Sequence, residues 1–261
     1  MNLALVQTDL IWQDKAANRQ NIGKMIDENT TNVKQADILI LPEMFTTGFT
    51  MAASKLAESM DGDTIHWMRS LADQYQIAVC GSMIAYEDGK FFNRFVWFSP
   101  ESKEVLSYDK KHLFSLADEN HHFHAGTDHL EIEYKNWRIM PFICYDLRFP
   151  VWMRNTQEVD LMICVANFPT KRKKAWSTLL PARAIENVCY VAGVNIIGRD
   201  GNEIEYPGCS GVFDYTGELL LDAKSDKAIN FVSIDKPPLD VFRRAYPFLK
   251  DRDHFNLLPN H

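Results

Sequence analysis

The stretch ADILILPEMF, residues 36 to 45, is an apolar run that ends at a proline and a glutamate. VDLMICVANFP, residues 159 to 169, repeats this pattern in the other half of the chain. In each half a helical stretch then leads into another apolar run, QIAVCGSMI (76 to 84) or CYVAGVNIIG (189 to 198). Each half therefore reads strand, helix, strand, helix, strand, which predicts an α/β fold. A four-layer α-β-β-α sandwich, with two facing sheets and helices outside, would bury strands this apolar on both faces.

Hydrophobic periodicity places the predicted elements along the whole chain. The predicted strands are 3–7, 37–41, 77–85, 94–98, 104–108, 130–134, 138–144, 160–166, 189–197, 211–214 and 229–234. The predicted helices are 17–28, 63–75, 150–157, 173–187 and a shorter one near 238–246. Because no Pro-, Gly- or Ser-rich linker separates the halves, residues 1–261 are predicted to form one domain built from two similar halves.

The charge balance argues against partners that bind through a basic surface. Lys and Arg number 28 against 35 for Asp and Glu, which gives a formal net charge of -7. Such a chain has no overall field to attract nucleic acid or an anionic membrane, so any anionic ligand must be held locally. The N-terminal run MNLALVQTDLIWQDK has no basic segment and is interrupted by Gln7 and Asp9, so neither a signal peptide nor a membrane span is expected.

The cysteines suit a reducing, cytoplasmic environment, because they form an odd set without CxxC spacing. They are Cys80, Cys144, Cys164, Cys189 and Cys209. Taken alone, Cys144 reads as a buried structural thiol, since cysteine is among the most buried residue types. Its position at the end of PFIC, with Asp146 and Arg148 directly after it to hold the turn, favours a chemical role instead.

Reactive side chains lie at the ends of three predicted strands. Glu43 follows LILP, Lys110 lies in YDKKHLF, and Cys144 lies in FICYDLRFP. Since active groups of α/β proteins gather at strand ends, these three would form a site for acyl transfer. The thiol would attack a carbonyl carbon, and Glu43 would accept its proton, pass a proton to the leaving nitrogen and later activate water. Lys110 and the backbone N–H of Tyr145 would stabilise the oxyanion, and the lysine charge would favour the thiolate.

These motifs resemble a known family. LPEMFTTGF, YDKKHLF with Glu119 nine residues after the lysine, and CYDLRFP are similar to the three signatures of the nitrilase superfamily of carbon–nitrogen hydrolases, and RAIEN (183 to 187) resembles a further family stretch. The resemblance covers the whole chain in order. It implies a Glu43, Lys110 and Cys144 triad, with Glu119 as a second glutamate that positions the lysine and the substrate. It also implies the α-β-β-α fold and a homodimer. The mechanism needs no cofactor.

Within the superfamily, CYDLRFP and YDKKHLF look most similar to the ω-amidases. Those enzymes hydrolyse the terminal amide of the 2-oxo acid monoamides 2-oxoglutaramate and 2-oxosuccinamate. Bacterial members are linked to disposal of the 2-oxo amides left by glutamine-dependent transamination, including in methionine salvage. Another amidase, a carbamoylase or a nitrilase could use the same triad on a different acyl group. A non-catalytic binding protein that kept the fold is a further alternative, although all three reactive residues are present.

The choice between Lys110 and Lys111 can be made in two ways. Family spacing selects Lys110, which stands two residues before His112. If the strand continues, Lys110 also shares a face with Tyr108 and His112, and Lys111 points the other way as a solvated charge.

Arg172 is the predicted substrate-binding residue. It lies in KRKK (171 to 174) shortly after ANFP, where its guanidinium could bind the carboxylate of a keto-acid amide, with Phe168 walling the pocket. The rest of the basic run is expected to be a solvated helix face. HHFH (121 to 124) and His129 come without an HExxH motif or paired cysteines, so no metal site is predicted, and no Walker A or GxGxxG motif indicates a nucleotide.

Overall fold

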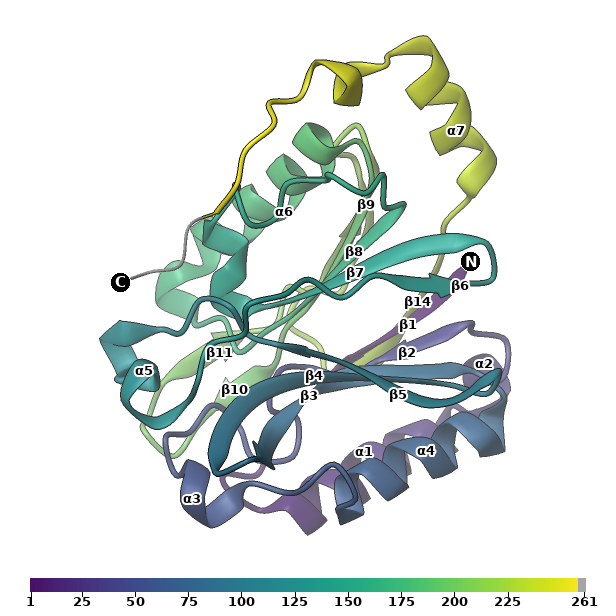
Figure 1. Cartoon of the computed structure of the whole chain (residues 1–261). Helices are drawn as coiled ribbons and strands as arrows, with labels where there is room; N and C mark the ends of the chain where they lie inside the picture. Colours follow the sequence, from purple (N-terminus) through teal and green to yellow (C-terminus); the bar gives the residue numbers. More distant parts are fainter. Residues whose placement is uncertain (258–261) are drawn as a thin grey trace.

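The computed structural model describes residues 1–257, without the side chain of Lys103. Two six-stranded mixed sheets face each other and helices lie on their outer faces (Figure 1), which confirms the predicted α/β sandwich. The first sheet has the order β14 (Ala228–Ser233), β1 (Asn2–Gln7), β2 (Ile38–Ile40), β3 (Ala78–Glu87), β4 (Lys90–Ser99) and β5 (Ser102–Asp109). The second sheet has the order β13 (Leu219–Asp222), β12 (Gly211–Phe213), β9 (Tyr190–Val194), β8 (Leu161–Val165), β7 (Trp137–Ile143) and β6 (Ile132–Tyr134).

The two sheets have the same topology, as the repeated sequence pattern suggests. Three parallel strands form the centre of each, β1, β2 and β3 in the first sheet and β7, β8 and β9 in the second. The antiparallel neighbours also correspond: β14 beside β1 matches β6 beside β7, and β4 beside β3 matches β12 beside β9. The segment after β2, which holds Glu43, therefore corresponds to the segment after β8, which holds Asn167.

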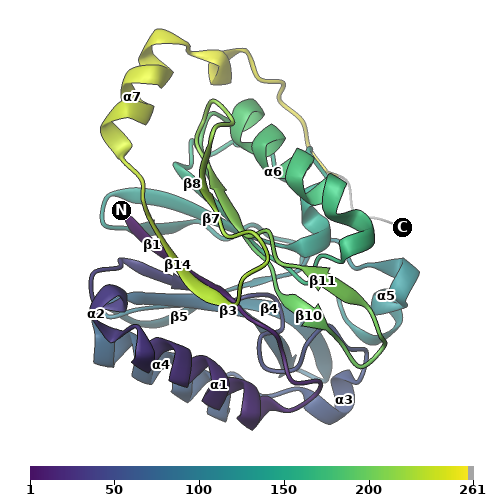
Figure 2. The same ribbon diagram turned by 180° about the vertical axis from the view of Figure 1, so that it is seen from behind.

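Alternate side chains of the central strands enter two different cores. Leu3 and Leu5 of β1 belong to the cluster shared with the second sheet, whereas Ala4 and Val6 belong to the cluster under α1 (Lys15–Glu28) and α4 (Asp63–Tyr75). On the other side of the molecule, α6 (Lys173–Asn187) covers the second sheet (Figure 2). Burial on both faces accounts for the near-continuous apolar runs of these strands.

The predicted helices at 17–28, 63–75, 173–187 and near 238–246 are confirmed as α1, α4, α6 and α7 (Lys236–Ala245). Asp14 caps α1, because its side chain accepts a hydrogen bond of 2.9 Å from the N–H of Ala17. The other helices of the described chain are α2 (Thr30–Val33), α3 (Ala53–Leu56) and α5 (Glu119–His122). Across residues 1–257, none of the helices has the length and apolar character needed to cross a bilayer.

The predicted helix at 150–157 is wrong. This segment forms a turn over 150–153 and then an irregular loop. The main-chain N–H of Asn155 donates to Asn187 Oδ1 at 2.8 Å, and Asn155 Oδ1 accepts from the N–H of Val159 at 2.8 Å. Side-chain hydrogen bonds of this kind compete with the helical ladder, and here they replace it.

The structure contains strands that the sequence analysis missed. β10 (Ile197–Arg199) and β11 (Glu205–Pro207) form a separate two-stranded antiparallel sheet, and β13 lies at the edge of the second sheet. Most residues of these strands are partly or fully exposed, so they lack the apolar pattern on which strand prediction depends. The β10–β11 pair matters for the site, because its connecting loop forms part of a cavity wall.

Candidate active site

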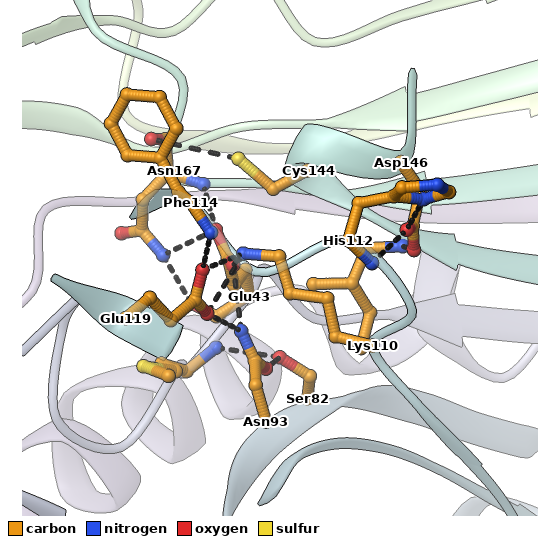
Figure 3. A network of polar contacts seen from close by, with 12 residues as sticks. Glu43, Ser82, Asn93, Lys110, His112, Phe114, Glu119, Cys144, Asp146 and Asn167 are labelled. Atoms are coloured by element: carbon orange, nitrogen blue, oxygen red, sulfur yellow. Dashed lines mark hydrogen bonds and ion pairs between the residues drawn. The ribbon is translucent and has the colours of Figure 1, made fainter. Parts of the chain in front are cut away.

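The three predicted reactive residues lie where edges of both sheets meet (Figure 3). Glu43 follows β2 and Lys110 directly follows β5, so both come from the first sheet. Cys144 directly follows β7 of the second sheet. Glu119 is the first residue of α5, in the connection between the two sheets. The fold therefore gathers the four side chains that the motifs single out.

Lys110 joins two carboxylates. Its Nζ donates a hydrogen bond to Glu43 Oε1 at 3.0 Å and to both carboxylate oxygens of Glu119 at 3.0 Å. All three side chains have 0% exposure. Burial alone would lower the pKa of Lys110, but the charges of Glu119 and Glu43 outweigh it and raise that pKa well above its ordinary value. The amine is thus a fixed positive charge.

Glu119 is held from two sides. The N–H of Phe114 donates to Glu119 Oε2 at 2.5 Å, in addition to the bonds from Lys110. Burial raises the pKa of Glu119, the Lys110 ammonium opposes that rise, and the charge of Glu43 adds to it. The ammonium of Lys110 thus lies between two buried acidic side chains.

Cys144 lies at a bend where a strand ends and a tight turn begins. The register of β7 and β8 pairs Ile143 with Val165, so Cys144 and Asn167 leave neighbouring parallel strands at the same edge. Cys144 has a φ of 47°, a left-handed conformation that is uncommon for a residue with a side chain. Its Sγ lies 3.9 Å from the main-chain oxygen of Asn167. Such a strained position at a strand end is typical of functional residues.

The thiol of Cys144 is protonated in this environment. Burial raises its pKa well above the ordinary value, the charge of Glu43 raises it further, and the charge of Lys110 lowers it. The charge of Lys110 therefore acts in the expected direction, but burial and the charge of Glu43 outweigh it. The resting site holds a thiol rather than a thiolate. A base must take the proton when sulfur attacks, and the carboxylate of Glu43 is next to it.

Asp146 holds the turn after Cys144, as the sequence predicts. It accepts hydrogen bonds from the N–H of Ile143 at 3.0 Å, from Tyr108 Oη at 2.7 Å and from the N–H of His112 at 2.9 Å, and it contacts His112 Nδ1 at 2.9 Å. Tyr108 and His112 flank Lys110 in the sequence. A single fully buried carboxylate thus ties the segment that carries the lysine to the turn that carries the thiol.

Sequence reasoning missed two asparagines that hold Glu43. Asn93 of β4 donates from Nδ2 to Glu43 Oε1 at 2.8 Å, and the main-chain N–H of Asn167 donates to Glu43 Oε2 at 2.7 Å. Asn167 leaves a partial signal, because it directly follows Ala166, which occupies in VDLMICVA the place that Glu43 occupies in ADILILPE. Asn93 leaves none, since it is one of three polar residues in the otherwise apolar, mostly aromatic run KFFNRFVWF.

A cavity of about 700 Å³ opens beside the cluster. Its lining includes Lys110, Cys144 and the predicted residues Tyr145, Phe168 and Arg172. Arg172 is half-buried and its guanidinium lies over the ring of Phe114, 4.7 Å from the centroid. Within residues 1–257 no carboxylate forms an ion pair with Arg172, so its charge is open to a ligand in the cavity.

Three further basic residues from the motifs, Lys111, His121 and His122, do not take part in the hydrogen bonds among Glu43, Lys110 and Glu119. Lys111 is half-buried over the ring of Trp152, 5.3 Å from its centroid, rather than solvated as predicted, because β5 ends at Asp109 instead of continuing. His121 and His122 are exposed at the end of α5. In the part of the chain that the structure describes, no three His, Cys, Asp or Glu side chains gather as metal ligands would.

Comparison with known proteins agrees with this geometry. The family model described as carbon-nitrogen hydrolase matches residues 2–243. The protein named Omega-amidase YafV of Yersinia enterocolitica is 40% identical over 259 residues, which cover 99% of each chain. The protein named 2-oxoglutaramate amidase of Bacillus subtilis is 29% identical over 253 residues, which cover 95% of this chain and 96% of that protein.

A solved structure has closely similar geometry. It is that of a CN-hydrolase superfamily protein from Xanthomonas campestris with an arsenic adduct in its active site. The TM-score is 0.94 and the sequence identity is 39%, with 98% of each chain covered.

Proposed function

The chain belongs to the carbon–nitrogen hydrolase family, and from this premise we propose that it is an ω-amidase acting on the 2-oxo acid monoamides 2-oxoglutaramate and 2-oxosuccinamate. Water cleaves the terminal amide to give the 2-oxo acid and ammonia. One observation supports this most strongly: the buried Glu43–Lys110 pair and Cys144 lie together beside a cavity that is also lined by Arg172, whose guanidinium has no ion pair within residues 1–257. Such a site combines an acyl-transfer centre with an anchor for a carboxylate.

The first half of the reaction forms a thioester. As Sγ of Cys144 attacks the amide carbon, Glu43 takes the thiol proton. The carbonyl oxygen becomes an oxyanion, which Lys110 Nζ and the N–H of Tyr145 stabilise. Tyr145 suits this role because the first N–H groups of a helical turn lack partners within that turn. Glu43 then gives its proton to the amide nitrogen, the C–N bond breaks, and ammonia leaves.

The second half of the reaction releases the acid. Glu43 takes a proton from water, and the resulting hydroxide attacks the thioester carbon. The same two donors stabilise the second oxyanion. The C–S bond breaks, the sulfur regains its proton from Glu43, and the 2-oxo acid leaves. Glu119 stays bonded to Lys110 throughout and keeps the ammonium in place.

Substrate selection falls to Arg172 and Phe168. The substrate carries its carboxylate at the end opposite to the scissile amide, so an anchor for it must lie in the cavity but away from the sulfur. Arg172 can bind a carboxylate with two parallel hydrogen bonds. Phe168, which is buried against Trp176, forms an apolar wall for the methylene carbons between the two ends.

A substrate panel tests this proposal. Ammonia release is measured with 2-oxoglutaramate, glutamine, a simple nitrile and, with product analysis, a carbamoyl amino acid. We expect 2-oxoglutaramate to be hydrolysed with the highest kcat/KM, and Cys144→Ala to abolish turnover while the variant still binds substrate. Turnover of the nitrile or the carbamoyl compound alone would contradict the substrate assignment. Turnover by Cys144→Ala would contradict the triad.

We further propose that residues 1–261 form one domain and that the protein works as a homodimer in the cytoplasm. Its proposed role there is the disposal of 2-oxo amides in methionine salvage. Two observations support parts of this. Val241, Tyr246 and Phe248, on α7 and just after it, expose large apolar side chains that a second copy could cover. All five cysteines are free, as in a reducing compartment. Light scattering on the purified protein tests the dimer.

A further inference from the structure

Asn93 contacts both carboxylates that bind Lys110. It lies on β4 with 0% exposure, and its Nδ2 donates to Glu43 Oε1 at 2.8 Å and to Glu119 Oε1 at 3.3 Å. Its main-chain oxygen accepts a hydrogen bond of 3.0 Å from the N–H of Lys110. One residue therefore touches both carboxylates through its side chain (Figure 3) and the lysine through its backbone.

Ser82 fixes which way the Asn93 amide points. Ser82 Oγ donates its proton to Asn93 Oδ1 at 2.8 Å, and it accepts the N–H of Met44, next to Glu43, at 2.9 Å. A reversed amide would turn Oδ1 toward two carboxylates, where acceptor would face acceptor. The amide nitrogen must therefore face the acids.

We propose that Asn93 is a positioning residue of the reaction: as a neutral donor locked by Ser82, it holds the Glu43 and Glu119 carboxylates apart and keeps Glu43 aligned with the thiol. The inference deepens the proposed function and rests on it, since it concerns the same site. A neutral donor suits the place. A second cation would neutralise the pair and weaken Glu43 as a base, whereas an apolar side chain would leave two buried carboxylate oxygens with Lys110 alone.

An isosteric substitution separates this role from a structural one. In Asn93→Asp the group that faces the carboxylates donates only while it is protonated. The titratable groups around it are Glu43, Glu119, Lys110 and Cys144, from the segments after β2, β5 and β7 and from α5. We expect the ratio of Asn93→Asp to wild-type kcat to fall as pH rises, because the introduced carboxylate repels both acids once it ionises. Asn93→Ala removes the hydrogen bonds to Glu43 and Glu119 and should lower kcat roughly ten- to hundredfold, on the scale of a lost hydrogen bond to a charged group, with KM changed less than about threefold.

Two further variants complete the test. Ser82→Ala keeps the amide but frees its orientation, so kcat should fall in the same direction as in Asn93→Ala and by less. Asn155→Ala is the matched control, because Asn155 is equally buried and hydrogen-bonded but bonds only to main-chain groups and Asn187. It should lower the melting temperature and leave kcat and its pH dependence unchanged.

The results decide between the alternatives. If Asn93→Ala and Ser82→Ala lose stability while the folded fraction keeps wild-type kcat, or if the Asn93→Asp ratio does not change with pH, the positioning role is overturned. Should Asn93→Ala fail to fold, Ser82→Ala and Asn93→Asp decide alone. Failure of the proposed function looks different: Cys144→Ala would then retain turnover, or wild-type protein would release no ammonia from 2-oxoglutaramate.

Discussion

Asn167 donates two hydrogen bonds of 2.7 Å to Glu43, one from its main-chain N–H to Oε2 and one from its Nδ2 to the main-chain oxygen. These residues lie in the corresponding segments after β2 and β8, one position out of step, so the repeat brings its own equivalent segments into contact. The contact fixes both the backbone and the carboxylate of Glu43. General-base catalysis depends on such alignment, because the base must lie within hydrogen-bond reach of the proton it takes.

Replacing Asn167 with alanine should therefore slow the reaction. The side-chain bonds to the Glu43 backbone and to its Oε2 (3.3 Å) are lost, while the main-chain donor remains, so we expect kcat to fall about tenfold, which corresponds to about 1.4 kcal/mol. Steady-state kinetics on the purified variant measure this effect. Wild-type kcat in Asn167→Ala would mean that the main-chain donor alone aligns the carboxylate.

Lys110→Arg should cost far more than its conserved charge suggests. Lys110 is 1% exposed and lies between two carboxylates at 3.0 Å, so a larger planar guanidinium cannot place a donor at the same point. We expect kcat to fall on the order of a hundredfold, the effect of removing one oxyanion donor. Lys111→Arg is the matched control and should keep kcat near that of the wild type. Near-normal kcat in Lys110→Arg would show that the residue supplies charge only.

The protonation state of Cys144 predicts its reactivity toward iodoacetamide. Since burial and Glu43 raise the pKa of this thiol, the thiolate fraction is small at neutral pH and grows with each step toward alkaline pH. Without substrate, the alkylation rate should rise steadily from about pH 7 through about pH 9, without a plateau. Mass spectrometry follows the reaction, with Cys144→Ser as the control for labelling at other cysteines. A plateau at neutral pH would mean that the thiolate is already formed.

Arg172→Ala should act on binding and not on chemistry. If the guanidinium holds the substrate carboxylate, KM for 2-oxoglutaramate should rise at least about tenfold, while KM for an uncharged aliphatic amide stays the same. Lys171→Ala is the matched control, because Lys171 lines the same cavity and is exposed. An unchanged KM in Arg172→Ala, or an equal rise for both substrates, would exclude Arg172 as the carboxylate anchor.

Asp146→Asn should destabilise the fold. The fully buried carboxylate accepts hydrogen bonds from Ile143, Tyr108 and His112. In the asparagine variant the NH₂ group replaces one of the accepting oxygens, so a donor would point at a donor. We expect a loss of about 3 kcal/mol in the free energy of unfolding, measured by urea denaturation. Asp214→Asn, in a turn where Asp214 accepts from Thr216 and Glu218, should cost less because water can replace the lost bonds. If both variants lost the same free energy of unfolding, the burial of Asp146 would not explain its contribution to stability.

The residues that were predictable from sequence share a local signal. Glu43 and Cys144 end or follow an apolar run, and Lys110 lies at the end of a predicted strand. The repeat of ADILILPEMF in VDLMICVANFP predicted two similar halves. Asn93 carries no such signal, because its role arises only when β4 packs against segments far away in the sequence. The segment 150–157 shows the reverse error: its composition allows a helix, but bonds between Asn155 and distant groups prevent one.

The sequence also did not show how strongly burial affects the pKa of the Cys144 thiol. The charge of Lys110 does act on Cys144 as predicted, but the state of the thiol depends on the sum of desolvation and two opposing charges. That sum follows from three-dimensional distances and not from spacing along the chain. The position of Lys111 was equally hard to predict. The strand β5 ends at Asp109, and the lysine side chain that follows lies over the ring of Trp152.

The division of reactive groups between the sheets has a consequence for dissection of the molecule. The acid and the amine come from the first sheet and the thiol from the second, so a chain cut between β5 and β6 would yield two fragments that are each incomplete. Mixing them could restore ammonia release only in molecules whose halves have docked to within a fraction of an ångström. The rate of ammonia release would then measure how much of the protein has reassembled correctly. Fragment complementation could therefore be followed by the enzyme's own activity.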